Sequence, residues 1–325
     1  MASQKRLFTG LQPSGQLHIG NYFGALLPTV EMFRQNQGLI MIADYHALTT
    51  VKDASTLREN IISVAKDYLA AGINLDNAII FKQSDVSEHT ELAWILECLV
   101  TVPFLMQAHA YKDKVAKGLE ANAGLFNYPM LMAADILLYD TDIVPVGQDQ
   151  RQHVEYAREA ATKFNAAYDE TFKEPAEQIQ KQVAVVPGTD GQKMSKSYKN
   201  TIPLFGAKDE ISKAVMSIVT GTGGETPINV HAIHLLVRGA LTNNFSDKKD
   251  GEEFSQLYSQ NKNNYKLLKE ALIEDLEKLI APMRVKRDAI TDEEVKKVLV
   301  DGARKAKALA SAKMADVRKK IGVTL

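Results

Sequence analysis

The sequence contains a single cysteine, Cys98, among its 325 residues. One cysteine forms no disulfide within the chain and cannot build a cysteine-rich zinc or iron–sulfur site, and such usage is typical of a reducing compartment. The amino-terminal residues also lack the apolar core of a secretory signal peptide. We therefore expect a cytoplasmic protein.

Long apolar runs and an excess of one charge are also missing. The longest apolar candidate, residues 130–139, is too short for a membrane helix, which needs about 18 residues, and it contains Asp135. Lysine and arginine number 39 against 40 aspartates and glutamates, which gives a net charge of −1. We expect no membrane contact, and any nucleic-acid contact must come from a local patch of charge.

The first 187 residues have the pattern of an α/β domain. Apolar runs at 39–43, 78–82 and 141–146 predict strands, while apolar residues spaced by three and four at 56–69, 88–99 and 151–164 predict helices. Strands that alternate with helices predict a parallel sheet with helices on both faces.

After Pro203 the strand-like runs stop and helical patterns dominate. Helices are predicted at 207–219, 252–258, 266–279, 293–299 and 303–321. The segment 301–325 is rich in lysine and arginine, which we interpret as a solvated helix face, with a nucleic-acid-binding patch as the alternative. The sequence therefore predicts a second, all-helical domain.

Residues 8–21 read as a strand, a turn rich in glycine and proline, and the start of a helix. That arrangement offers free backbone N–H groups and a positive helix end to an anion. Gly20 would let a flat base or ribose approach the backbone, and His18 and Asn21 share one helix face, from which both could point at phosphates. A capped helix start explains the same four residues about as well.

A second segment, Lys193-Met-Ser-Lys-Ser197, follows glycines at 188 and 191. Two lysines in a short flexible loop can close on a triphosphate, so we expect a mobile loop at 188–200. An exposed basic loop without a ligand is the alternative. The sequence shows neither a Ser/His/Asp order nor a metal-protease helix, so an enzyme here must act by positioning and fixed charge.

Taken in this order, segments 18–21 and 193–197 resemble the HIGH and KMSKS signatures of class I aminoacyl-tRNA synthetases. The central stretches 123–139 and 141–153 are similar to bacterial-type tryptophanyl-tRNA synthetases. The resemblance implies a Rossmann-type catalytic domain at 1–187, the loop at 188–200, and a smaller helical anticodon-binding domain at 201–325, whose last helix can pack back on the catalytic domain. It also implies a homodimer.

The resemblance further implies an ATP site with Mg²⁺ carried in by the nucleotide, since the sequence shows no dedicated carboxylate cage for a metal. His18, Lys193 and Lys196 would be catalytic. Gln148 stands where the family usually has glutamate, which leaves its ribose contact open. The implied ATP-binding residues are Gln12, Pro13, Ser14, Gly20, Asn21, Gly147, Gln148, Asp149, Lys193, Met194, Ser195, Lys196 and Ser197.

Asp135 is an isolated carboxylate in the apolar helical pattern of residues 130–139. An indole N–H only donates, so a carboxylate in an apolar pocket would match it, and Met132 could pack on the ring face. The alternative is an internal aspartate paired with a structural arginine or lysine. By resemblance, the same pocket would include Tyr128, Val144, Val146 and Gln150.

The implied reaction has two steps. The carboxylate of L-tryptophan attacks the α-phosphorus of ATP, which gives tryptophanyl-adenylate and pyrophosphate, and tRNA(Trp) then takes the tryptophan. The first nucleophile is already anionic, which fits the missing catalytic triad because the reaction mainly needs alignment and charge neutralisation. A tyrosine-specific relative, a tRNA-independent adenylyltransferase of the same superfamily and a non-catalytic tRNA-binding paralogue are the alternatives.

Overall fold

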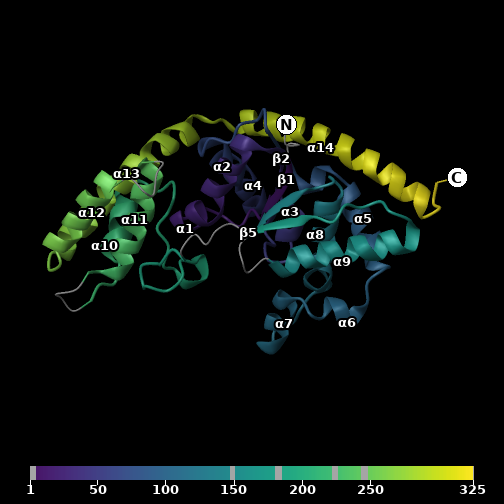
Figure 1. Ribbon diagram of the computed structural model, residues 1–325, viewed down its shortest axis with the longest axis horizontal. Coiled ribbons are helices and arrows are strands. Elements are labelled where there is room, and N and C mark those ends of the chain that lie inside the picture. The colour runs from purple at the N-terminus through teal and green to yellow at the C-terminus, as the bar shows by residue number, and fades with distance from the viewer. Residues whose placement is uncertain (1–4, 147–150, 180–184, 222–225, 243–247, 325) are drawn as a thin grey trace.

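The computed structural model describes residues 5–146, 151–179, 185–221, 226–242 and 248–324 (Figure 1). Within these residues, five parallel strands form one sheet. The order of the strands in the sheet is β3-β2-β1-β4-β5. Their bounds are β1 Arg6–Leu11, β2 Gln37–Ile42, β3 Ala78–Lys82, β4 Ile143–Val146 and β5 Ala176–Ile179. The strands predicted at 39–43, 78–82 and 141–146 are β2, β3 and β4. The sequence did not indicate β5, because its Ala-Glu-Gln-Ile lacks a β-branched apolar run.

Alternate residues of the strands pack against helices on opposite faces of the sheet, as the period of two requires. Leu7 and Ile40 belong to the core under the helices that follow β1 and β2, while Phe8 and Leu39 belong to the core on the other face. The first face carries α1 Ile19–Asn21, the π-helical turn η1 Tyr22–Leu26, α2 Leu27–Gln35 and α4 Ala54–Ala70. The second face carries α5 Glu88–Glu97, α8 Ala123–Leu137 and α9 Arg151–Tyr168. The predicted α/β architecture is therefore confirmed.

Three short helices lie at the ends of these layers. α3 Asp44–Ala47 follows β2 directly, and α6 Val102–Leu105 and α7 His109–Ala116 connect α5 to α8. Figure 1 shows α6 and α7 on the side of the molecule opposite to the long carboxyl-terminal helix. None of the helices in the described ranges is long and apolar enough to cross a membrane.

Beyond residue 207 the described chain forms five helices: α10 Lys208–Met216, α11 Ile228–Thr242, α12 Lys248–Gln260, α13 Tyr265–Ala289 and α14 Asp292–Lys320. The prediction of separate helices at 293–299 and 303–321 is wrong, because α14 continues through Gly302. A β-carbon at Gly302 would lie 1.7 Å from the carbonyl oxygen of Ile80, so this glycine marks where the helix meets β3. α11 was not predicted.

α14 leaves the other four helices and runs along the edge of the sheet (Figure 1). It packs against β3, α4 and α5. Part of its basic face pairs with the rest of the chain: Arg318 donates to Glu91 of α5, and Lys313 lies 2.6 Å from Asp140. Arg304 remains exposed, so a solvated face describes only part of the helix.

Candidate active site

The chain brings the two signature segments together through backbone pairing. The amide of Ile19 donates to the carbonyl of Ile202 at 3.0 Å, and the amide of Leu204 donates to the carbonyl of Leu17 at 3.0 Å. The segment that leaves the lysine loop thus runs antiparallel to the segment that holds His18, with an isolated bridge between His18 and Pro203. As a result, Lys196 Nζ reaches the carbonyl oxygen of Ser14 in the glycine–proline turn at 3.1 Å.

His18 and Asn21 cap the helix start reciprocally. The backbone N–H of Asn21 donates to His18 Nδ1 at 3.2 Å, and the backbone N–H of His18 donates to the side-chain Oδ1 of Asn21 at 3.1 Å. The capped start that the sequence left open is therefore present. Burial, with the nearby charge of Lys196, lowers the pKa of His18 to about 4. Because Nδ1 accepts the backbone bond, the neutral ring carries its proton on Nε2, from which it can donate to a phosphate oxygen.

Gly20 allows two side chains to approach the helix start closely. A β-carbon at this position would lie 2.9 Å from His18 Nδ1 and 3.3 Å from the β-carbon of Met194. Met194 itself is buried. Gly20 thus has a packing role between the signatures. The approach of a base or ribose to Gly20 stays a prediction.

Asn200 organises the lysine loop and was not predicted. Its Oδ1 accepts from the amide of Ser195 at 2.8 Å, and its Nδ2 donates to Asp190 Oδ1 at 2.7 Å and to the carbonyl of Lys193 at 3.1 Å. A β-carbon at Gly188 would lie 2.2 Å from Asn200 Nδ2, which explains a glycine there. Nothing in the spacing of the sequence marks this asparagine.

A cavity of about 520 Å³ opens at the carboxyl ends of β1 and β4. Chain order reverses between these strands, and such a switch point is the usual ligand site of an open α/β sheet. Five of the predicted site residues line the cavity: Gln12, Tyr128, Met132, Asp135 and Val144. Gly147, Gln148, Asp149 and Gln150 lie outside the described residues, and Val146 is described only as the last residue of β4.

A second cavity, of about 620 Å³, lies beside the first and shares His46, Thr49 and Tyr128 with it. The hydroxyl of Tyr128 lies 2.8 Å from His153 Nε2. Burial raises the pKa of Tyr128 to about 12, so the phenol keeps its proton at neutral pH. The described residues hold no group of three or more His, Cys, Asp or Glu side chains that could bind a metal ion.

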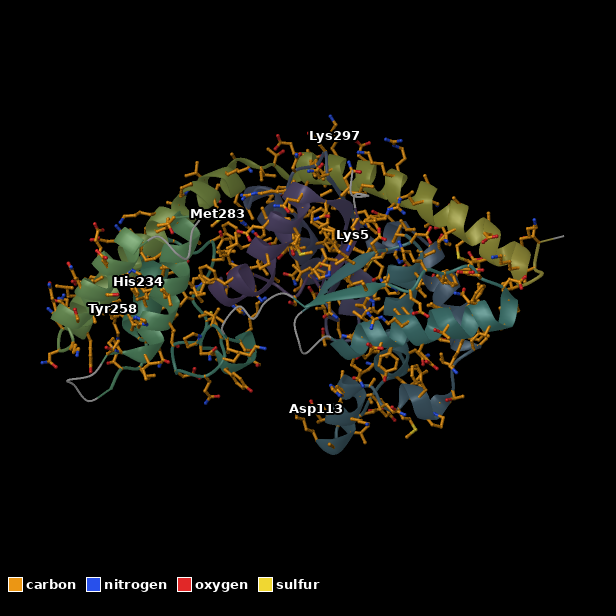
Figure 2. All side chains as sticks on the ribbon, in the orientation of Figure 1. Lys5, Asp113, His234, Tyr258, Met283 and Lys297 are labelled. Carbon is orange, nitrogen blue, oxygen red and sulfur yellow. The ribbon has the colours of Figure 1, made fainter. Side chains whose placement is uncertain are left out.

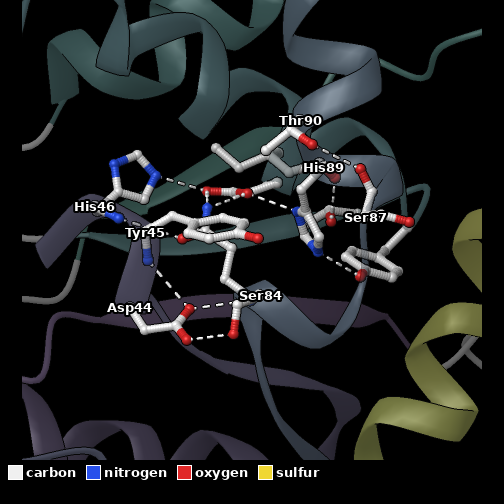
Figure 3. A network of polar contacts seen from close by, with 12 residues as sticks. Asp44, Tyr45, His46, Ser84, Ser87, His89 and Thr90 are labelled. Atoms are coloured by element: carbon white, nitrogen blue, oxygen red, sulfur yellow. Dashed lines mark hydrogen bonds and ion pairs between the residues drawn. The ribbon is translucent and has the colours of Figure 1, made fainter. Parts of the chain in front are cut away.

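Asp135 is 1% exposed and has three side-chain partners. His89 Nδ1 lies 2.6 Å from Oδ1, His46 Nε2 lies 2.9 Å from Oδ2, and Gln83 Nε2 donates to both oxygens at 2.8 and 3.1 Å. In Figure 3 the rings of His46 and His89 point into this network from opposite sides. The carboxylate thus has internal partners, as in the alternative of a structural aspartate. Its partners are two histidines and the side-chain amide of Gln83, however, and not an arginine or lysine.

Asp135 remains ionised in this setting. Burial alone raises its pKa, but the hydrogen bonds and electrostatic attraction of His46 and His89 outweigh burial and bring the pKa to about 2. The site therefore combines an anionic acceptor with an apolar cavity wall that includes Met132 and Val144. Such a wall suits a ligand with one buried donor.

The partners of Asp135 come from segments that directly follow strands. His46 lies in α3 after β2, Gln83 follows the last residue of β3, and His89 lies in the first turn of α5. Asp44 ties two of these segments together, because its Oδ1 accepts from the amide of Ser84 at 3.0 Å. Sequence reasoning missed all three partners, although polar residues placed directly after two predicted strands were a usable signal.

Class I aminoacyl-tRNA synthetases combine three features: a parallel sheet with a switch-point cavity, a helix start capped by histidine, and a lysine loop that is joined to that helix start. The chain belongs to this family: the family model described as tRNA synthetases class I (W and Y) matches residues 2–292. The resemblance inferred from the signatures is therefore confirmed.

Individual relatives are similar over nearly the whole chain. A tryptophan–tRNA ligase of Fusobacterium nucleatum is 45% identical over 323 residues, covering 98% of each chain, and one of Rhodopirellula baltica is 43% identical over 321 residues, covering 98% and 99%. Among solved structures, the tryptophanyl-tRNA synthetase of Campylobacter jejuni complexed with ADP and tryptophan has a TM-score of 0.89 at 42% identity, with 98% and 99% coverage.

Proposed function

We propose that this protein is a tryptophan–tRNA ligase. It activates L-tryptophan with ATP to tryptophanyl-adenylate and pyrophosphate, and then transfers tryptophan to tRNA(Trp). The observation that carries the specificity is Asp135, a buried and ionised acceptor in the wall of an apolar switch-point cavity. Full-length relatives that bear this activity in their names, at 43–45% identity, support the proposal.

The tryptophan side chain occupies the 520 Å³ cavity. Its indole N–H donates to Asp135, and its ring packs between Met132 and Val144. The hydroxyl of Tyr128, held by His153, faces the polar end of the amino acid. Val146 and Gln150 complete this pocket.

ATP lies along the turn at residues 12–15 and the loop at 193–197. The Lys196 ammonium, which lies on the Ser14 carbonyl in the structure, moves onto a phosphate oxygen of the nucleotide. The tryptophan carboxylate then forms a bond to the α-phosphorus, while the bond to the bridging oxygen of pyrophosphate breaks. Lys193, Lys196 and the His18 Nε2–H stabilise the charge on the leaving pyrophosphate, and Mg²⁺ accompanies the triphosphate.

The remaining ATP contacts are assigned to Gln12, Pro13, Ser14, Gly20, Asn21 and the segment 147–149.

Burial lowers the pKa of Lys196, while the charge of Asp67 opposes this effect. An ammonium that has already lost part of its hydration gains more from a phosphate oxygen than a fully hydrated one does.

Residues 201–325 serve as the tRNA-reading domain. Residues 1–187, together with the loop at 188–200, carry the adenylation chemistry in the cytoplasm. A second copy of the chain covers the surface beside the second cavity. Trp94 and Leu48 line that cavity at 68% and 47% exposure, and exposed apolar side chains of this size mark interfaces. If this surface joins two copies, Trp94→Glu converts the dimer to a monomer in sedimentation velocity.

Tryptophan-dependent ATP–pyrophosphate exchange, with tyrosine as the control amino acid, tests the function directly. We expect exchange with tryptophan and none above background with tyrosine. Charging of tRNA(Trp) then separates a tRNA ligase from an adenylyltransferase. Exchange driven by tyrosine, or exchange without charging, would favour one of the alternatives instead.

A further inference from the structure

A second pair of side chains lies behind Asp135. The hydroxyl of Tyr139 is 2.8 Å from His89 Nε2, and His89 Nδ1 is 2.6 Å from Asp135 Oδ1. Tyr139 and His89 are 1% and 0% exposed. Both lie outside the wall of the 520 Å³ cavity, so neither can contact tryptophan there.

The two bonds fix where the imidazole carries its proton. Burial, with the negative charges of Asp135 and Glu88, raises the pKa of Tyr139, so its O–H is retained and can donate. When this O–H donates to Nε2, a neutral His89 must carry its hydrogen on Nδ1 and donate it to Asp135. The opposite tautomer would place a nitrogen lone pair against a carboxylate oxygen at 2.6 Å.

The same bonds orient the carboxylate. His46, which bonds Oδ2, lines the cavity, whereas His89, which bonds Oδ1, does not. Oδ2 is therefore the oxygen on the cavity side, and Oδ1 is held from behind. Gln83 bridges the two oxygens and limits rotation of the group.

We propose that Tyr139 and His89 are positioning residues for tryptophan recognition: Tyr139 sets the tautomer of His89, and His89 holds Asp135 as an oriented acceptor for the indole N–H. This inference rests on the proposed contact between Asp135 and indole. It assigns part of the specificity to two side chains that do not touch the substrate.

Tyr139→Phe is the central test, because the phenyl ring keeps its stack on Phe8 at 5.6 Å and its edge contact with Phe81 at 5.8 Å. Pyrophosphate exchange is measured with tryptophan and with benzothienylalanine, in which sulfur replaces the indole N–H. We expect KM for tryptophan to rise about 5- to 10-fold, because a weakened charge-assisted bond affects only the substrate with a donor. KM for the analogue, KM for ATP and kcat should stay near their parent values.

The helical part of the chain offers a matched control. There Tyr258 lies 3.0 Å from His234 Nδ1, and Figure 2 labels both residues. His234 Nε2 lies 3.0 Å from Asp275, which gives a second Tyr–His–Asp arrangement with the two ring nitrogens exchanged. Tyr258→Phe removes the same kind of bond far from the cavity. It should change thermal stability to a similar degree but leave the preference for tryptophan over the analogue unchanged.

A second pair of variants tests His89 itself. The side-chain amide of asparagine places a donor near the position of Nδ1, so His89→Asn should keep most of the preference for tryptophan, whereas His89→Leu should lose it. Nitrogen-15 NMR of the parent protein gives a readout that needs no variant: we expect Nδ1 of His89 to carry the proton shared with Asp135 and Nε2 to accept from the Tyr139 hydroxyl. An Nε2–H tautomer would overturn the proposal.

The outcomes separate this inference from the proposed function. If Asp135→Asn lowers the preference for tryptophan but Tyr139→Phe retains it in full, Asp135 binds the indole without help from Tyr139, and the positioning role of Tyr139 and His89 is wrong. If the parent and Asp135→Asn show the same preference, the contact with indole is itself wrong, and the positioning role that depends on it is wrong too.

Discussion

Arg287 of α13 donates from Nε to Oδ1 of Asp67 on α4 at 2.5 Å, and this bond joins the long helix after residue 265 to the sheet-covering helices. Arg287 also donates to Ser63 Oγ at 2.8 Å and lies over the ring of Phe205 at 5.1 Å. Asp67 is 1% exposed. Burial raises the pKa of Asp67, against the opposing charges of Arg287 and Lys196. One carboxylate therefore interacts with both α13 and the loop lysine.

Removal of this arginine should be costly for stability. We expect Arg287→Leu to lower the free energy of unfolding by about 3 to 5 kcal/mol, because Asp67 is left buried without its charged partner. Urea unfolding measures the effect. Lys213→Met is the control: it breaks an exposed pair with Asp209 and should change stability by less than about 0.5 kcal/mol. Additive losses in Arg287→Leu, Asp67→Leu and the double variant would mean that the two side chains are not coupled.

Lys196→Ala should act on the chemical step of adenylation. The charge that Lys196 meets grows as pyrophosphate leaves, so we expect kcat for pyrophosphate exchange to fall about 100-fold or more, with a much smaller change in KM for tryptophan. Lys199→Asn is the control within the same loop, because Lys199 has a φ of 53° that asparagine tolerates. An unaltered kcat with weakened tryptophan binding would contradict the role given to Lys196.

His18 should make the protein less stable in mild acid. The pKa of His18 is near 4 in the folded state and 6.5 for an ordinary histidine. Above pH 6.5 its imidazole is neutral in both the folded and the unfolded chain, so it adds no pH dependence to folding stability there. As the pH falls from 6.5 to 4, only the unfolded chain takes up the proton, and folding stability declines. Asparagine can accept the same capping bond without titrating. The stability of His18→Asn relative to the parent should therefore improve over this range, and NMR titration of His18 should give an apparent pKa near 4.

Two glycine-to-alanine changes should have opposite signs. Gly302→Ala places a methyl group 1.7 Å from the Ile80 carbonyl oxygen, so α14 must shift away from β3, and we expect a loss of at least about 2 kcal/mol. Gly251, in α12, has no neighbour within 4 Å of an added β-carbon. Gly251→Ala should gain up to about 1 kcal/mol from helix propensity. Thermal unfolding of both variants tests the fit of α14; an equal effect of the two would argue against it.

Sequence patterns predicted the parts of the fold that have regular periodicity. Four of the five described strands, β1 to β4, and most helices were found, because apolar residues at periods of two and 3.6 mark buried faces directly. α11 was missed. α14 was divided at Gly302, because a glycine in a helical pattern usually signals the end of a helix. Here the glycine marks contact with the backbone of Ile80, which only the packing of the chain reveals.

The candidate site was predicted unevenly for a similar reason. Asp135 could be found because a lone carboxylate in an apolar run is conspicuous, and the structure places it with Met132 and Val144 in one cavity. His46 and His89 could not be assigned to it, because they lie 89 and 46 residues away along the chain. Which strand-end residues meet depends on the order of strands in the sheet, and that order is a property of the folded chain.

The position of α14 against β3 has a consequence for how the chain reaches this structure during synthesis. β3 is an outer strand of the sheet, and the helix that covers it is translated after all five strands. Until α14 emerges from the ribosome, the outer side of β3 presents unpaired backbone groups that another nascent chain could join. A chain truncated before Asp292 should therefore aggregate through this strand. Translation that stops before α14 would then give an aggregation-prone fragment and not a smaller active enzyme.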